Sequence, residues 1–131
     1  MRDIEFRGKR TDNGEWVHGN LVRGCDEKYA YIVEFGNAEL CRNYVDVNPE
    51  TVGQYTGLKD RNGTKIFEGD IVKRVWLGKM SIYQIVYDNG IASFIGQAGV
   101  RFTTFDYDST EFEVIGNIYD NKLEDFNNVT C

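Results

Sequence analysis

Few side chains in this sequence have the types and spacing that catalysis requires. A nucleophile triad needs an imidazole base beside a Ser or Cys, and the only histidine among the 131 residues is His18. It lies in an alternating segment after Trp16 with no nucleophile motif near it, so we interpret it as a half-exposed structural residue. The sequence also contains no G-x-S-x-G, phosphate-loop or H-E-x-x-H motif. We therefore expect a protein that is not an enzyme.

Acidic pairs offer the chemistry of a metal site. Glu68 with Asp70, and Asp106 with Asp108, are spaced to share one face of a strand, and carboxylate oxygens are ligands of Mg²⁺. In a chain with 21 acidic residues such pairs also arise by chance, and Asp70 is expected to accept hydrogen bonds from backbone amides at the Gly69 turn. The three cysteines form no C-x-x-C pair, so neither zinc nor a disulfide framework is supported. We expect no metal and no cofactor, and a metal-dependent nuclease is the third interpretation.

A basic segment with an aromatic residue offers the chemistry of nucleic-acid binding. Residues 59–79 carry six Lys/Arg and three Asp/Glu, whereas residues 1–58 carry seven and ten and residues 80–131 carry two and eight. Cations beside a stacking ring suit a nucleic-acid strand. The residues of this alternative site are Lys59, Lys65, Lys73, Arg74, Trp76 and Lys79. Strand alternation places Lys73 and Arg74 on opposite faces, and the net charge of the chain is −6, so solvated surface cations are the simpler interpretation.

Hairpins must position these residues, and three Asn-Gly pairs indicate where the hairpins turn. Asn13-Gly14, Asn62-Gly63 and Asn89-Gly90 each separate segments with strand-like patterns. Alternation and β-branched residues predict strands near residues 4–7, 16–22, 29–35, 69–77, 82–87, 91–95, 100–107 and 112–119, with a loop at 96–99. The sequence thus predicts a mainly β fold of antiparallel hairpins.

Residues 49–72 are the most informative stretch. Asn48 and Pro49 predict a short helical turn, because Asn caps free N–H groups and Pro fits the first helical position. Tyr55 stands between glycines, where we expect a buried ring, and residues 60–63 predict a hairpin turn. Loops on rigid scaffolds carry function, so we predict a macromolecule-binding site there. Its residues are Tyr55, Asp60, Arg61 and Asn62.

This stretch, PETVGQYTGLKDRNGTKIFEGDIV, is similar to the signature of the YopX family of phage and prophage proteins. Two further pieces agree in family order: IEFRGK at 4–9 with NGEWV at 13–17, and FEVIGNIYDN at 112–121. The resemblance implies a β-rich phage protein of unassigned biochemical function and carries over no catalytic residue. His18 departs from the pattern, since Tyr is more usual at that position in the family.

The length of 131 residues fits one domain. We divide it into an N-terminal hairpin region (1–48), the signature turn and hairpin (49–68), a barrel-like part (69–121) and a polar tail (122–131). The strand succession resembles, in part, a small SH3-like barrel with one or two short helical turns.

The chain lacks an apolar run of about 20 residues, so we expect no membrane association and a place in the bacterial cytoplasm. The leading expectation is a non-catalytic module that binds a host or phage protein, with nucleic acid as the alternative partner. Long β edges and segments of opposite charge also allow a homo-oligomer.

Overall fold

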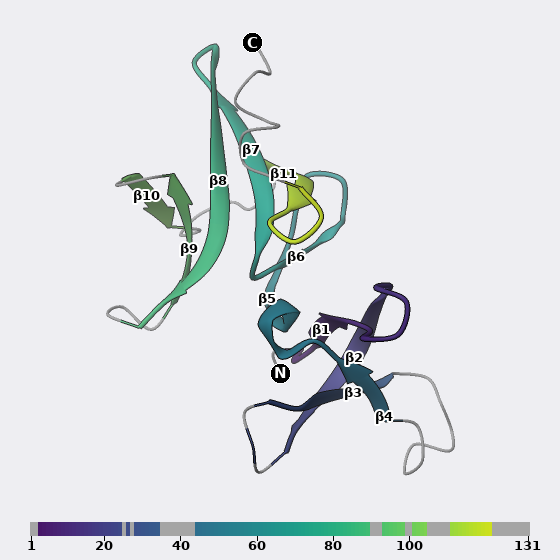
Figure 1. Ribbon diagram of the computed structural model, residues 1–131. Helices are drawn as coiled ribbons and strands as arrows, with labels where there is room; N and C mark the ends of the chain where they lie inside the picture. The colour runs from purple at the N-terminus through teal and green to yellow at the C-terminus, as the bar shows by residue number, and fades with distance from the viewer. Residues whose placement is uncertain are drawn as a thin grey trace. The chain divides into compact units, whose positions relative to one another are not determined.

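Antiparallel β-strands make up most of the part of the chain that the computed structural model describes (Figure 1). The structure describes residues 3–24, 26, 28–34, 44–89, 93–98, 101–104 and 111–121, with the backbone alone at 76 and 101–104. The predicted mainly β class is confirmed. The strands are β1 (Phe6–Lys9), β2 (Trp16–Arg23), β3 (Ala30–Glu34), β4 (Tyr44–Val47), β5 (Gly53–Lys59), β6 (Lys65–Phe67), β7 (Asp70–Trp76), β8 (Lys79–Asp88), β9 (Ser93–Ala98), β10 (Arg101–Thr104) and β11 (Phe112–Asn117).

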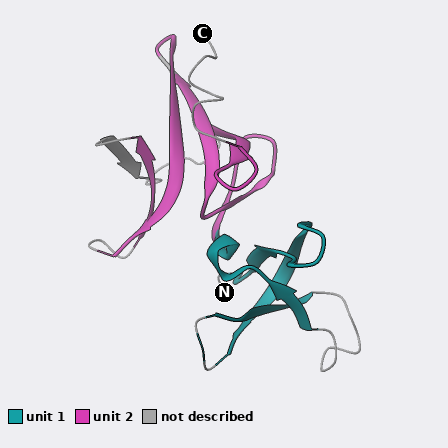
Figure 2. Cartoon of the chain, viewed as in Figure 1, with its two compact units in different colours: residues 1–55 teal, residues 56–131 magenta. Residues whose placement is uncertain are grey.

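The chain divides into two compact units, residues 1–55 and 56–131, coloured teal and magenta in Figure 2. Strand β5 carries the chain from the first unit into the second. The division therefore falls inside the 49–68 segment that the sequence marks as one signature.

The first antiparallel sheet has the strand order β4-β3-β2-β1-β5-β6, of which β4 to β1 and the start of β5 belong to unit 1. Just after β1, Arg10 forms an isolated antiparallel bridge with Val47 of β4. One face carries a core of Val17, Ala30, Ile32 and Val47, to which Phe6, Leu21, Val45 and Val52 add partly buried apolar surface. Between β4 and β5 the chain makes a single 3-10 turn, η2 (Pro49–Thr51). The predicted cap is confirmed, because the backbone N–H of Glu50 donates to Asn48 Oδ1 at 3.1 Å.

Unit 2 contains a second antiparallel sheet with the order β10-β9-β8-β7-β11 and the hairpin of β5 with β6. Ile66 from the hairpin packs with Val72, Ile85 and Phe112 from the sheet, so the hairpin and the sheet share one core. Both Ile71 and Val72 of β7 are fully buried, as a central strand requires.

The predicted barrel is wrong for the part of the chain that the structure describes. The second sheet is open, with β10 and β11 at opposite ends, and no pairing closes it. Alternation and hairpin signals are the same in an open sheet and a barrel, so the sequence did not separate the two. The predicted loop at 96–99 is also wrong over residues 96–98, which belong to β9 and pair with β10. Gly96 pairs with both Ile85 and Thr103 inside the sheet, and residue 99 lies outside the described residues.

Two of the predicted Asn-Gly turns have the left-handed glycine that such turns need, with φ of +74° at Gly14 and +81° at Gly63. The third hairpin joins β8 to β9, where Asp88 pairs with Ser93. The predicted tail at 122–131 lies outside the described residues.

Candidate functional site

The expected burial of Tyr55 is confirmed, since only 5% of the residue is exposed. Its backbone N–H donates to the carbonyl of Glu5 at 2.8 Å, which joins β5 to the chain just before β1. Tyr55 therefore lies within unit 1 and not at the hairpin turn that follows β5.

Asp60 is also buried, with 4% of its surface exposed, and it accepts three backbone hydrogen bonds. Asn62 and Thr64 donate to its Oδ1 at 2.8 and 2.9 Å. Val114 in β11 donates to its Oδ2 at 2.9 Å, across 54 residues of sequence. Burial alone would raise the pKa of Asp60, but the N–H groups of Val114, Thr64 and Asn62 hold its pKa below the usual value. Asp60 thus fastens the β5–β6 turn to the edge of the sheet.

Arg61 and Asn62 are exposed at that turn. The backbone N–H of Arg61 donates to the carbonyl of Phe112 at 3.0 Å, and Phe112 pairs with Arg74 in the sheet. The turn is therefore held beside β11, on a rigid support, with these two side chains in solvent.

The basic segment is spread over several surfaces. Lys73 contacts Glu113 at 3.4 Å, and Arg74 contacts Glu111 at 3.9 Å and lies 5.5 Å from the Phe112 ring centre. The expected placement of Lys73 and Arg74 on opposite faces fits these separate contacts. The exposed lysines are Lys59 and Lys65 on the β5–β6 hairpin and Lys79 on β8. The structure describes only the backbone of Trp76.

The β7–β8 hairpin extends past the strands on either side of it (Figure 1). Strand β11 pairs with β7 only as far as Arg74, and β9 pairs with β8 only from Gln84 onward. We call residues 75–79 the β7–β8 tip. Its turn consists of Leu77 and Gly78, with φ of +52° and +77°. Both φ angles are positive, as a type I′ turn requires, and such angles are costly for leucine.

Apolar side chains are exposed at this tip. Leu77 is 88% exposed and Val75 is 59% exposed. This surface does not follow from the strand predicted at 69–77, because that strand includes residue 77. The available signal was Gly78, which leaves a two-residue loop between Trp76 and Lys79.

The other residues that the sequence marks as candidate metal ligands or bases contact the protein itself, where the structure describes them. Asp70 is buried, and the backbone N–H of Phe67 donates to its Oδ2 at 2.8 Å, as expected for a turn-bonding carboxylate. His18 is half-exposed and its Nδ1 lies 3.1 Å from Glu5 Oε2. Asp106 and Asp108 lie outside the described residues. Among the described residues, no group of three or more His, Cys, Asp or Glu side chains could hold a metal ion.

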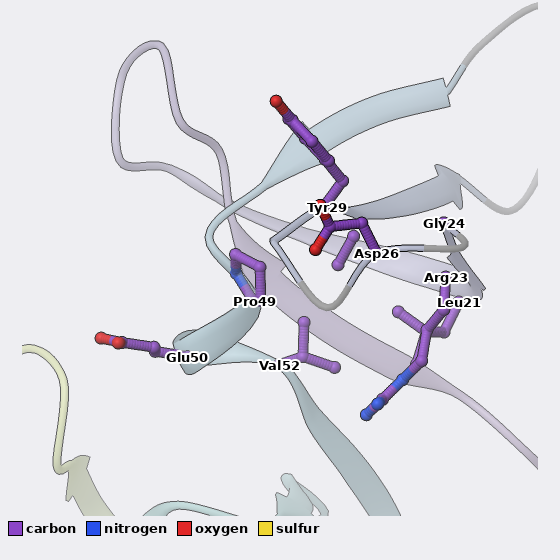
Figure 3. A pocket seen from close by; sticks show the side chains of 9 residues that line it. Leu21, Arg23, Gly24, Asp26, Tyr29, Pro49, Glu50 and Val52 are labelled. Atoms are coloured by element: carbon purple, nitrogen blue, oxygen red, sulfur yellow. The ribbon is translucent and has the colours of Figure 1, made fainter.

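A pocket of about 370 Å³ lies in unit 1 and was not anticipated from the sequence (Figure 3). It is formed where the end of β2, the connection to β3 and the η2 turn meet. The lining residues are Leu21, Arg23, Gly24, Asp26, Tyr29, Ala30, Pro49, Glu50 and Val52. No single motif predicts it, because its walls come from segments that only the fold brings together.

Comparison with known proteins gives a family and one similar fold. The model of the YopX protein family matches residues 5–124. The crystal structure of protein EF1440 from Enterococcus faecalis aligns with a TM-score of 0.55 and 22% identity, over 95% of this chain and 99% of that one. At that identity the likeness concerns the fold alone. A search of curated proteins finds no match. In the part of the chain that is described, no helix is long and apolar enough to cross a membrane.

Proposed function

The chain belongs to the YopX family, and we propose that it is a non-catalytic module, encoded by a phage or prophage, that binds a protein partner through unit 2. The partner is a phage or host protein met in the bacterial cytoplasm. The observation that carries the proposal is the exposed Leu77 in a left-handed backbone conformation at the β7–β8 tip.

Leu77 carries two costs that folding alone does not explain. A leucine with positive φ is strained by about 1 kcal/mol or more, and its side chain is left in water. Both costs are removed if Asn or Gly occupies the position. Binding to an apolar surface of a partner recovers the second cost, so a binding role accounts for the choice of residue.

Charge near the tip favours an acidic partner surface. Lys79 is exposed at the tip, and Arg61 and Asn62 are exposed at the β5–β6 turn, which is fastened to β11 beside β7. Arginine is one of the residue types that contribute most to binding at protein interfaces. We therefore retain Arg61 and Asn62 as part of the binding surface and assign Tyr55 and Asp60 to its support.

Nucleic acid is the alternative partner, with Lys59, Arg61, Lys65 and Lys79 as the exposed cations. The ion pairs of Lys73 with Glu113 and of Arg74 with Glu111 weigh against it. A phosphate contact at either cation competes with a carboxylate that is already present, and the acidic chain repels a polyanion.

Affinity purification from phage-infected and uninfected host cells tests the proposal. The variant Val75→Thr/Leu77→Asn should lose the specific partner while keeping the wild-type fold by circular dichroism. Ile4→Asn is the matched control, because Ile4 is an apolar residue of similar exposure, 56%, in unit 1. Equal recovery of every partner by the tip variant and the wild type would sink the proposal.

Fluorescence anisotropy with single- and double-stranded DNA and RNA across a salt series tests the alternative. Arg61→Glu/Lys79→Glu is a cleaner control than reversal of Lys73 or Arg74, because reversing a cation that pairs with Glu113 or Glu111 also leaves that carboxylate repelled. Affinity whose logarithm falls linearly with log salt, and a shallower slope in the variant, would place nucleic acid first.

A further inference from the structure

We propose that the pocket in unit 1 binds a small zwitterion with an apolar side chain, such as an amino acid or the end of a short peptide. The ligand carboxylate would pair with Arg23 and the ligand ammonium with Asp26, over an apolar floor. This site is independent of the partner surface on unit 2.

The floor of the pocket supplies apolar contact. Leu21, Ala30 and Val52 belong to or pack against the core of unit 1, and Pro49 adds a rigid wall. The volume of about 370 Å³ is near the lower end of the roughly 300–1,000 Å³ typical of small-molecule sites, so the ligand must be small.

The charged groups of the rim fix the class of ligand. Asp26 lies above Val52 and Arg23 lies to its right, whereas the Glu50 side chain extends to the left, away from both (Figure 3). Among the described residues Arg23 makes no ion pair or hydrogen bond through its side chain, and neither does Asp26 beyond the bond that its Oδ1 accepts from the N–H of Lys28. Arg10, by contrast, is paired with Asp12 at 2.8 Å.

A cation and a carboxylate at the rim of one apolar floor complement a ligand that carries both charges and an aliphatic group. Guanidinium binds carboxylate through two parallel hydrogen bonds, which favours Arg23 as the carboxylate site. The Asp26 carboxylate keeps Oδ2 for an ammonium, since the Lys28 hydrogen bond goes to Oδ1.

The test is an NMR titration of the full chain with L-leucine, 3-methylbutylamine and 4-methylpentanoate, which share the aliphatic group but differ in charge. Leucine should bind saturably and shift the backbone amides of Gly24, Ala30 and Val52. Each analogue that lacks one charge should bind at least about tenfold more weakly, the factor that corresponds to one ion pair of about 1.4 kcal/mol. Leucyl-leucine distinguishes a free amino acid from the end of a peptide as the ligand. If the dipeptide binds more tightly than leucine, the site is assigned to peptide ends.

Two variants make the charge assignment specific. Arg23→Gln should weaken leucine and 4-methylpentanoate but not 3-methylbutylamine, and Asp26→Asn should do the reverse. Both are surface changes, and the amide oxygen that Asp26→Asn introduces can still accept the Lys28 bond, so the connection should remain folded. Arg10→Gln is the matched control in the same unit. Equal affinity for leucine and both analogues, or no saturable shift with any of them, would overturn the proposal.

Discussion

Asp60 is a residue whose chemistry is used within the fold and not on a ligand. Its carboxylate accepts backbone N–H groups from its own turn and from β11. Asp60→Asn replaces one acceptor oxygen by a donor that faces an N–H, so we expect the free energy of unfolding to fall by about 2 to 3 kcal/mol in urea titrations. Asp12→Asn, at an exposed ion pair, is the control and should change stability little.

The lowered pKa of Asp60 also leads us to predict that the stability of the fold depends on pH. The pKa of Asp60 is lowered in the folded state from its ordinary 3.8, so its contribution is complete above that pH and is lost as pH falls through the folded pKa. We expect the stability difference between wild type and Asp60→Asn to shrink under acidic conditions. A difference that is unchanged down to the acid transition would show that the charge of Asp60 does not stabilise the fold.

For Leu77 we predict a gain in stability, in contrast to the loss expected for Asp60→Asn, when its exposed apolar side chain is replaced. Asn adopts positive φ more easily than Leu, so Leu77→Asn should raise the free energy of unfolding by about 0.5 to 1 kcal/mol while partner binding falls. Gly78→Ala is the paired change: nothing lies within 4 Å of an added Cβ, yet its φ of +77° should cost about 1 kcal/mol. If Leu77→Asn destabilises the chain, the strain argument for function fails.

Hairpins are the elements that the sequence predicts best, because a turn is a local property. Asn48, Gly14 and Gly63 act within a few residues of themselves, and their turns are found as expected. Whether strands close into a barrel, and whether Gly96 lies in a loop, depends on partners far along the chain. The candidate site divides in the same way, since Arg61 and Asn62 at the turn were predicted from local signals and the pocket was not.

One strand contact also depends on such distant partners. A Cβ on Gly19 in β2 would lie 1.9 Å from the carbonyl oxygen of Val33 in β3, and backbone cannot move aside. Gly19→Ala should therefore cost about 3 kcal/mol or more and remove amide protection along β2 and β3 in hydrogen exchange. Gly14→Ala, with positive φ and nothing near its Cβ, should cost only about 1 kcal/mol. Similar costs for both would mean that the β2–β3 approach is looser than the structure has it.

At the scale of the whole molecule, the two units have cores drawn from separate parts of the chain. Ile32 belongs to the core of unit 1 and Ile66 to the core of unit 2, and both are fully buried. Each changed to Ala should cost about 2 to 5 kcal/mol, since a cavity is left. The places where stability is lost, however, should differ.

Hydrogen exchange measured strand by strand reports those places. Ile32→Ala should lower protection mainly in β2, β3 and β4, and Ile66→Ala mainly in β6, β7, β8 and β11, because local opening follows the core that is weakened. The double variant should then show the sum of the two costs to within about 0.5 kcal/mol. A uniform loss of protection across every strand in either single variant would instead mean that the chain unfolds as one cooperative unit, with β5 transmitting the loss. In that case ligand binding in the unit 1 pocket would also raise the stability of the sheet in unit 2 that contains β7 and β8.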